Sequence, residues 1–142
     1  MSEQFSKDFE QFQVKIHKFV LDTNFASKAS EYKEAFNKMA SVAPDDMKHY
    51  IQKSPDFLQA RNESLSLMEK IVVLHDNLEE IFKMDETSLY LKCKGDLASI
   101  DKEIALHVKE SAKLIYRFEK VSEIGRKAIE KVDNPFFAQA DV

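Results

Sequence analysis

Glycine and proline are so scarce in this chain that its structural elements must be long. Only two glycines and three prolines occur among 142 residues, whereas glycine alone averages about 7% of protein residues. Sheet-containing folds need both residue types for their many turns. A chain with few turn residues has few turns, and the sequence therefore predicts an all-α fold.

The first 43 residues carry one continuous helical pattern with a single weak interruption. Apolar residues at spacings of 4, 3, 4 and 3 lie on one face of a helix, and these are Phe5, Phe9, Phe12, Ile16 and Phe19. Asp22-Thr23-Asn24 are poor helix formers. The pattern then resumes through Ala26, Ala29, Tyr32, Phe36 and Met39. Either one helix of about 40 residues kinks near Asn24, or two helices meet there.

Two prolines mark the next helix starts. Pro44 precedes two acids, which suits the first turn of a short helix. Ser54-Pro55 repeats the signal, with Ser54 as N-cap of a second long helix that runs to about Met84. This helix carries two adjacent apolar stripes, namely Leu58, Leu65, Met68, Val72, His75 and Phe82, and Leu67, Ile71, Leu74, Leu78 and Ile81. Its wide apolar surface predicts contact with two neighbouring helices.

The position of the next turn is open between two sites. Residues 85–88 are polar and include three good caps, whereas Lys94-Gly95-Asp96 combines a C-cap glycine with a following N-cap. We favour residues 85–88, which would place Gly95 inside a helix. The last helix then runs to Asp133, before Pro135, along a stripe with 3 and 4 spacing: Leu97, Ile100, Ile104, His107, Ser111, Leu114, Phe118, Val121, Gly125, Ala128 and Val132.

These patterns together predict an antiparallel bundle of three to four long amphipathic helices with coiled-coil-like packing. Residues 1–133 form the single domain and residues 134–142 a C-terminal tail. We expect a core that includes Leu65, Met68, Ile71, Val72, Leu78, Ile104, Leu114, Phe118 and Val121.

Charge, cysteine content and hydropathy favour a cytoplasmic protein. The net charge is −4 and no basic stripe follows any helix, so we expect no nucleic-acid partner. The polar N-terminus lacks the apolar region of a signal peptide, and no apolar run approaches the roughly 18 residues that span a bilayer. A lone cysteine, Cys93, forms no internal disulfide and suits a reducing compartment. A membrane partner is therefore not expected.

Four histidines raise the question of a metal site. We expect His17 and His49 to face solvent, whereas His75 and His107 lie on core-facing stripes. The Glu-x-x-His pairs of di-iron bundles are absent. The interpretation we favour is that His75 and His107 are buried or half-buried and bond to Ser111, Glu79 or a backbone carbonyl. They remain weak candidates for metal ligands or for a pH-sensitive role.

Catalytic motifs are missing from the sequence. It contains no phosphate-binding glycine loop, no Gly-x-Ser-x-Gly and no His-Glu-x-x-His, so we expect neither an enzyme nor a cofactor. Arg61 stands where the second long helix needs an apolar residue, and we expect it to extend to solvent at the end of the bundle. Cys93 is expected to be an inert thiol.

The tail contains Asn134-Pro135-Phe136. This tripeptide resembles the Asn-Pro-Phe motif that EH domains of endocytic proteins bind, and the resemblance implies a partner site at these three residues. The alternative is structural, because Asn134-Pro135 ends the helix and Phe136-Phe137 then cover the end of the bundle.

We expect a non-enzymatic protein–protein interaction module, such as an adaptor, a small chaperone or an assembly subunit, that forms a homodimer or binds an obligate partner. The phenylalanine stripe (Phe5, Phe9, Phe12 and Phe19) is the expected surface, since exposed rings at a chain end must dock on the chain's own bundle or on a second chain. Two alternatives are a bundle that binds a metal or small ligand through core histidines, and a peripheral lipid-surface protein.

Overall fold

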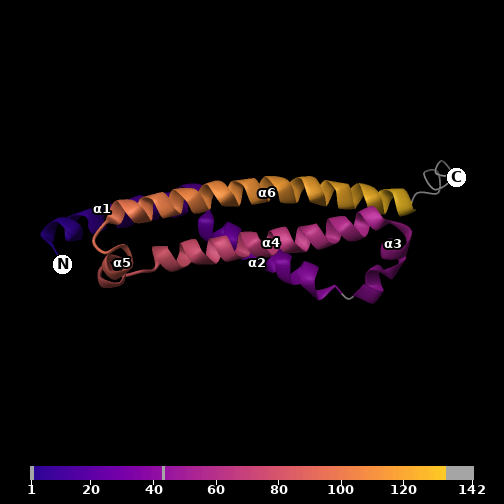
Figure 1. The fold of residues 1–142 in the computed structure, drawn as a ribbon, viewed down its shortest axis with the longest axis horizontal. Helices are drawn as coiled ribbons and strands as arrows, with labels where there is room; N and C mark the ends of the chain where they lie inside the picture. The colour runs from indigo at the N-terminus through magenta and orange to yellow at the C-terminus, as the bar shows by residue number, and fades with distance from the viewer. Residues whose placement is uncertain (1, 43, 134–142) are drawn as a thin grey trace.

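The computed structural model describes residues 2–42 and 44–133. Within these residues the chain contains no strand and consists of helices: α1 (Glu3–Thr23), α2 (Phe25–Ser41), the 3-10 helix η1 (Pro44–Met47), α3 (Lys48–Lys53), α4 (Pro55–Phe82), α5 (Glu86–Cys93) and α6 (Leu97–Asp133) (Figure 1). The expectation of an all-helical chain is confirmed.

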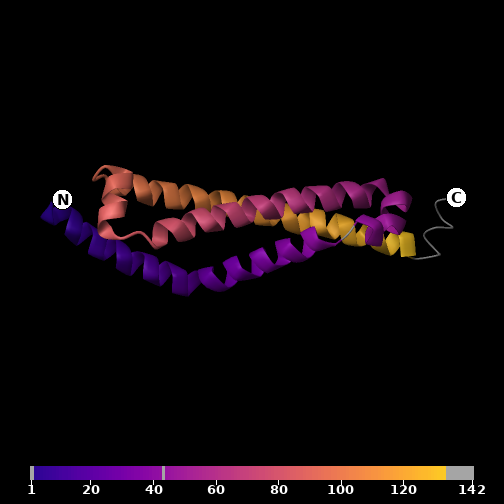
Figure 2. The ribbon, with the colours of Figure 1, turned by 90° about the horizontal axis from the view of Figure 1, so that it is seen from below.

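The molecule is elongated, and two long antiparallel helices run along most of it. α4 and α6 lie side by side and share the most extensive contact of any helix pair. α1 and α2 form a bent rod along one side of this pair (Figure 2), with α5 near one end and α3 near the other. α4 contacts both α6 and α2, as its two apolar stripes predict.

Side-chain caps start the helices where the sequence indicates. The hydroxyl of Ser54 accepts a hydrogen bond from the Phe57 N–H at 3.2 Å, with Pro55 at the first position of α4. Ser2 caps α1 and Asp85 caps α5 in the same manner. Each cap supplies a partner for an N–H that the first helical turn leaves unpaired.

Asn24 separates α1 from α2. Its backbone is left-handed, with φ 55°, a conformation that asparagine tolerates better than most non-glycine residues. The sequence left open either one kinked helix or two helices that meet near Asn24. The structure has two helices that meet at this residue. The rod bends there (Figure 2).

Two turns follow α4, one at residues 83–85 and one at residues 94–96, so the preference for residues 85–88 is wrong; of these four residues only Asp85 lies in a turn, and the other three begin α5. α4 ends at Phe82 and α5 ends at Cys93. Lys94 and Gly95 both have positive φ, and the Gly95 N–H donates to the carbonyl of Tyr90 at 3.2 Å. Gly95 therefore terminates a helix, because its backbone takes the left-handed conformation that favours glycine.

The core has one dense region and a thinner continuation. The dense region lies where α1 meets α5, α6 and the end of α4, and its buried members are Phe5, Phe9, Phe12, Ile16, Ile81, Leu89, Cys93 and Ile100. A smaller cluster toward the other end contains Ala60, Leu67 and Val121, with Leu114 and Phe118 packed against it. The bulky side chains of α1 account for most of the difference in apolar burial.

Four of the nine predicted core residues are buried: Met68, Ile71, Leu78 and Val121. The other five are half-buried, so the prediction is wrong for them in degree: Leu65, Val72, Ile104, Leu114 and Phe118. Leu65 and Leu114 line surface hollows. A helical stripe is buried only where a neighbouring helix covers it, and α1 and α2 cover only one side of the α4–α6 pair.

Candidate functional site

The phenylalanine stripe lies mainly in this chain's own core. Phe5, Phe9 and Phe12 are buried, and the Phe5 ring meets Tyr90 edge-on with centroids 4.9 Å apart. Phe19 is half-buried, with its ring 5.8 Å from that of Phe82. Of the two ways of docking this helix, the chain's own helices supply the surface here. The stripe therefore offers a partner no exposed ring at Phe5, Phe9 or Phe12.

His75 is a residue of α4 and packs against two aromatic side chains of α2. It is 8% exposed, its ring stacks on Phe25 at 5.1 Å, and the Tyr32 ring lies 5.3 Å away. Nε2 and the hydroxyl of Ser111 are 3.2 Å apart. Nδ1 has no hydrogen-bond partner among the described residues. Burial lowers the pKa of His75, because a charged imidazolium is disfavoured away from water.

The Ser111–His75 contact lacks the other parts of a nucleophilic site. A serine within hydrogen-bond reach of a histidine is the first requirement of such a site. Both side chains are buried, however, and a catalytic histidine also needs a group that orients its second nitrogen. Because Nδ1 has no such group in the described part of the chain, the geometry is that of a core hydrogen bond.

His107 follows the same interpretation. It is half-buried, and Nδ1 lies 2.8 Å from the carbonyl oxygen of Glu103. The expectation that both stripe histidines bond to Ser111, Glu79 or a backbone carbonyl is therefore confirmed, with Ser111 as the partner of His75 and the Glu103 carbonyl as that of His107. His17 and His49 are exposed, as expected. No three His, Cys, Asp or Glu side chains group into a metal-binding arrangement within residues 2–42 and 44–133.

The contacts of Arg61 and Cys93 are those of residues that stabilise the fold. The guanidinium of Arg61 donates to the carbonyl of Val42 at 3.3 Å, just beyond the end of α2. This is a polar contact at the end of the helix pair, as expected for an arginine within an apolar stripe. The thiol of Cys93 is buried, and its sulfur lies 3.8 Å from the Tyr90 carbonyl oxygen. Burial restricts the access that thiol reactivity requires.

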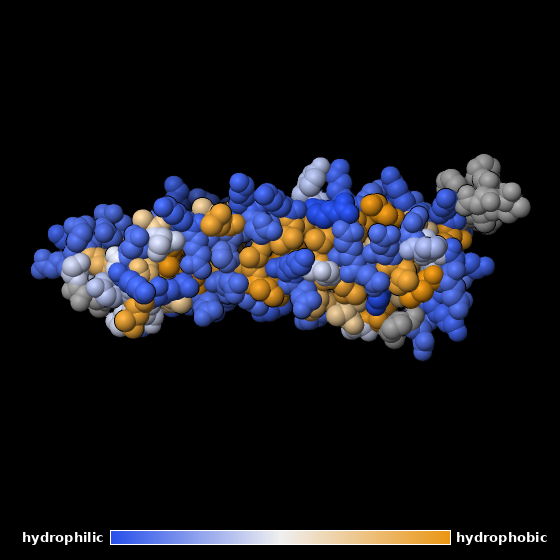
Figure 3. Space-filling view, in the orientation of Figure 1, coloured by the Kyte–Doolittle hydropathy of each residue, from blue (hydrophilic) through white to orange (hydrophobic). Residues whose placement is uncertain are grey.

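One side of the α4–α6 pair is left uncovered, and we name it the open face. Its groove of about 450 Å³ is lined by Ser66, Glu69, Lys70, Val73, Leu74, Glu110 and Leu114. Val73 is 51% exposed. Leu106 is 66% exposed and lies one helical turn from Glu110 on α6. Figure 3 shows apolar surface gathered between the two helices on this face.

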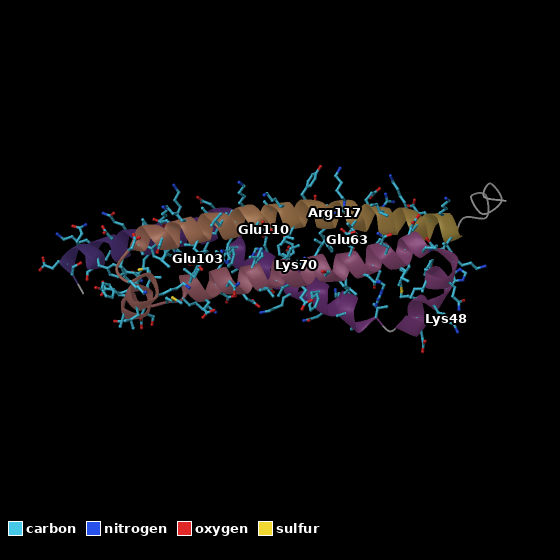
Figure 4. The ribbon with its side chains drawn as sticks, in the orientation of Figure 1. Lys48, Glu63, Lys70, Glu103, Glu110 and Arg117 are labelled. Atoms are coloured by element: carbon cyan, nitrogen blue, oxygen red, sulfur yellow. The ribbon has the colours of Figure 1, made fainter. Side chains whose placement is uncertain are left out.

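Charged side chains cross and border the open face. Arg117 Nε on α6 donates to Glu63 Oε1 on α4 at 2.8 Å, and this carboxylate raises the pKa of the Arg117 guanidinium. Glu103, Glu110 and Arg117 follow each other at intervals of seven residues along α6, with Lys70 opposite on α4 (Figure 4). Apolar side chains between flanking charges are the pattern of a helix-docking groove.

Sequence reasoning did not single out Val73 or Leu106. Both lie off the apolar stripes of their helices, and isolated exposed apolar residues are common on proteins. Val73 lines the groove, and Leu106 is exposed one helical turn from the lining residue Glu110. Which exposed apolar residues border a groove depends on how the two helices are paired.

Asn134, Pro135 and Phe136 lie outside the described residues, so the proposed EH-domain motif stays a prediction. Among the described helices, none combines the length and apolar character needed to cross a bilayer. Comparison with models of known protein families, with curated proteins and with solved structures finds no match.

Proposed function

We propose that this protein is a non-enzymatic interaction module whose open face binds an amphipathic helix of a partner protein. The observation that carries the proposal is the exposed apolar groove between α4 and α6, at Val73, Leu74 and Leu114. Two antiparallel helices present parallel ridges, and a third helix inserts apolar anchors between such ridges at intervals of three and four residues.

The charges of the groove select the kind of helix. Its lining holds two carboxylates, Glu69 and Glu110, against the single ammonium of Lys70. A partner with basic residues along one edge of its apolar face complements this excess. Opposite charges at the rim mainly raise the association rate and fix the orientation, whereas apolar anchors supply most of the affinity.

A docked helix would complete an antiparallel bundle with coiled-coil-like packing, the finer architecture that the 4 and 3 spacing of α4 and the heptad charges of α6 favour. Binding of this kind suits an adaptor or a small chaperone. The buried free thiol of Cys93 suits the reducing cytoplasm, where we place the protein.

Photo-crosslinking from the open face tests the proposal. A benzophenone amino acid replaces Leu106 in the full chain expressed in its native source, and a matched variant carries it at Val14, which is 71% exposed on α1. We expect a discrete adduct from position 106 that is absent from position 14. Mass spectrometry of the adduct should locate an amphipathic segment with a basic edge.

A synthetic peptide of that segment should bind the purified chain and gain helicity by circular dichroism. Val73→Glu should weaken its binding by roughly tenfold or more, because the carboxylate occupies an apolar contact. An adduct to the chain itself would show that the open face binds a second copy of this chain instead of a partner protein. Equal labelling from positions 106 and 14 would remove the support for the open face.

A further inference from the structure

A second hollow lies away from the open face, where the end of α2 and η1 meet α4 and α6. It has a volume of about 340 Å³, and its apolar lining comes mainly from Met39, Met47, Phe57, Leu65 and Ile129. Small-ligand pockets are mostly apolar, with a few polar groups, and span about 300–1,000 Å³. This hollow falls at the lower end of that range.

The polar groups around the hollow are cationic or neutral. Its lining contains Arg61, Arg126, Ser64 and Ser122 but no carboxylate. Arg126 is paired with Glu123 and Glu130. Arg61 donates to the carbonyl of Val42 and has no carboxylate partner among the described residues. One guanidinium at the rim is therefore available to an anionic group.

Gly125 lines the hollow and contributes no side chain that would fill it. Glycine within a helix is less favourable than alanine, and Gly125 is the one glycine inside the described helices. Packing does not require it, because a Cβ at this position would lie 3.5 Å from the Cβ of Ala60, an ordinary contact. Gly125, Leu65 and Ile129 all line the hollow, so we expect a larger side chain at position 125 to take up part of its volume.

We propose that this hollow binds a single-chain amphiphile with a carboxylate head, such as a medium-chain fatty acid. The alkyl chain fills the space above Gly125, and the carboxylate accepts hydrogen bonds from the guanidinium of Arg61. Guanidinium and carboxylate form bidentate, charge-assisted pairs. The site shares no lining residue with the open-face groove, so it stands independently of the helix-binding proposal.

The test titrates decanoate into the purified full chain by calorimetry and by amide NMR. We expect one site with a dissociation constant of roughly 10–100 µM. Shift changes should gather around Met39, Leu65 and Gly125 and be absent at Val73. Decyltrimethylammonium, which has the same chain with a cationic head, should bind at least tenfold more weakly, since it faces the Arg61 guanidinium.

Substitutions at two positions separate the roles of the carboxylate head and the alkyl chain. Arg61→Gln should weaken decanoate binding by roughly tenfold and leave binding of neutral 1-decanol unchanged, and Arg61→Lys should restore part of the loss. Lys18→Gln, which removes the same charge at an exposed position of α1, is the matched control. Gly125→Leu should abolish binding of both ligands, with Gly125→Ala as its control.

Any of four results would overturn the proposal. One is the absence of saturable decanoate binding; another is a set of shift changes centred outside the hollow. The third is equal binding of decanoate to wild type and Arg61→Gln, which remains decisive if Gly125→Leu does not fold. A dimer of the wild type that decanoate leaves intact and Gly125→Leu dissociates would assign the hollow to a second copy of the chain.

Discussion

The two halves of the bent rod bury very different amounts of apolar side chain. α1 buries Phe5, Phe9, Phe12 and Ile16, whereas α2 buries Phe25 alone, its first residue. Both halves carry apolar residues at intervals of three and four in the sequence. The comparison shows that a regular apolar pattern predicts which side of a helix faces the core, while side-chain size and the neighbouring helices decide how much is buried.

The helix of the rod whose backbone lies closer to its neighbours is the one that buries fewer large side chains. The backbone of α2 approaches α4 over a longer stretch than that of α1 approaches α6. Apart from Phe25, however, the side chains of α2 are exposed or half-buried, so this approach buries little apolar area. The rings of Phe5, Phe9 and Phe12 on α1 are buried in one cluster with residues of α5 and α6. α1 should therefore be the firmly held half and α2 the half that opens first.

The largest expected effect comes from removing a ring of α1. Phe9 is buried, so Phe9→Ala should lower the free energy of unfolding by about 3–5 kcal/mol. Phe36→Ala, the matched change at a half-buried position of α2, should cost less than half as much. Urea unfolding monitored by circular dichroism measures both. Equal losses would break the distinction between the two halves.

Hydrogen exchange sharpens the comparison without mutation. We expect amides of α2 beyond its first turn to exchange more than tenfold faster than those in the middle of α1, a difference of over about 1.4 kcal/mol in opening free energy. Amides in the middle of α4, which packs on both α2 and α6, serve as the slow reference. If α2 were protected as strongly as α4, the two halves of the rod would unfold as one unit.

The junction between the halves should respond to backbone preference. Asn24 has φ 55°, and a residue with a Cβ and no compensating side-chain group is disfavoured there by about 1 kcal/mol. Asn24→Ala should therefore lower the unfolding free energy by about that amount, and Asn24→Gly should retain or slightly raise it. The same urea experiment compares the two variants. A loss from glycine that exceeds the loss from alanine would contradict this reading of the bend.

The smallest expected effect is the pH dependence of the contact between α2 and α4. Burial lowers the pKa of His75 below its ordinary value of 6.5, with Lys28 of α2 acting in the same direction and Asp76 opposing it. The unfolded chain then binds a proton at higher pH than the folded chain. The free energy of unfolding should fall as pH is lowered from about 6.5, and level off below the folded-state pKa.

His75→Gln should flatten this slope between pH 7 and pH 5, since glutamine does not titrate. His17→Gln is the control at an exposed position and should leave the slope as in wild type. Thermal unfolding at a series of pH values measures all three chains. A slope that persists in His75→Gln would place the titrating group elsewhere.

The helices and their starts were predictable because they depend on neighbouring residues in the chain. Ser54-Pro55 starts α4 through a hydroxyl three residues from its N–H partner, and Asn24 and Gly95 supply the conformations that end α1 and α5. Lys94-Gly95 and Asp85 each act locally, so both turns form. The prediction treated the two turn signals as alternatives, but they are compatible. The short helix α5 lies between the two turns.

The sequence by itself determined an all-helical chain, its main breaks and the side of each helix that carries apolar residues. Only the tertiary structure decided that Phe5, Phe9 and Phe12 are buried, that His75 faces Ser111, and that Val73 and Leu106 remain exposed. The physical reason is that helical periodicity is a local property of the backbone. Burial and the pairing of side chains across helices depend on which surfaces distant segments cover, and no local spacing encodes that.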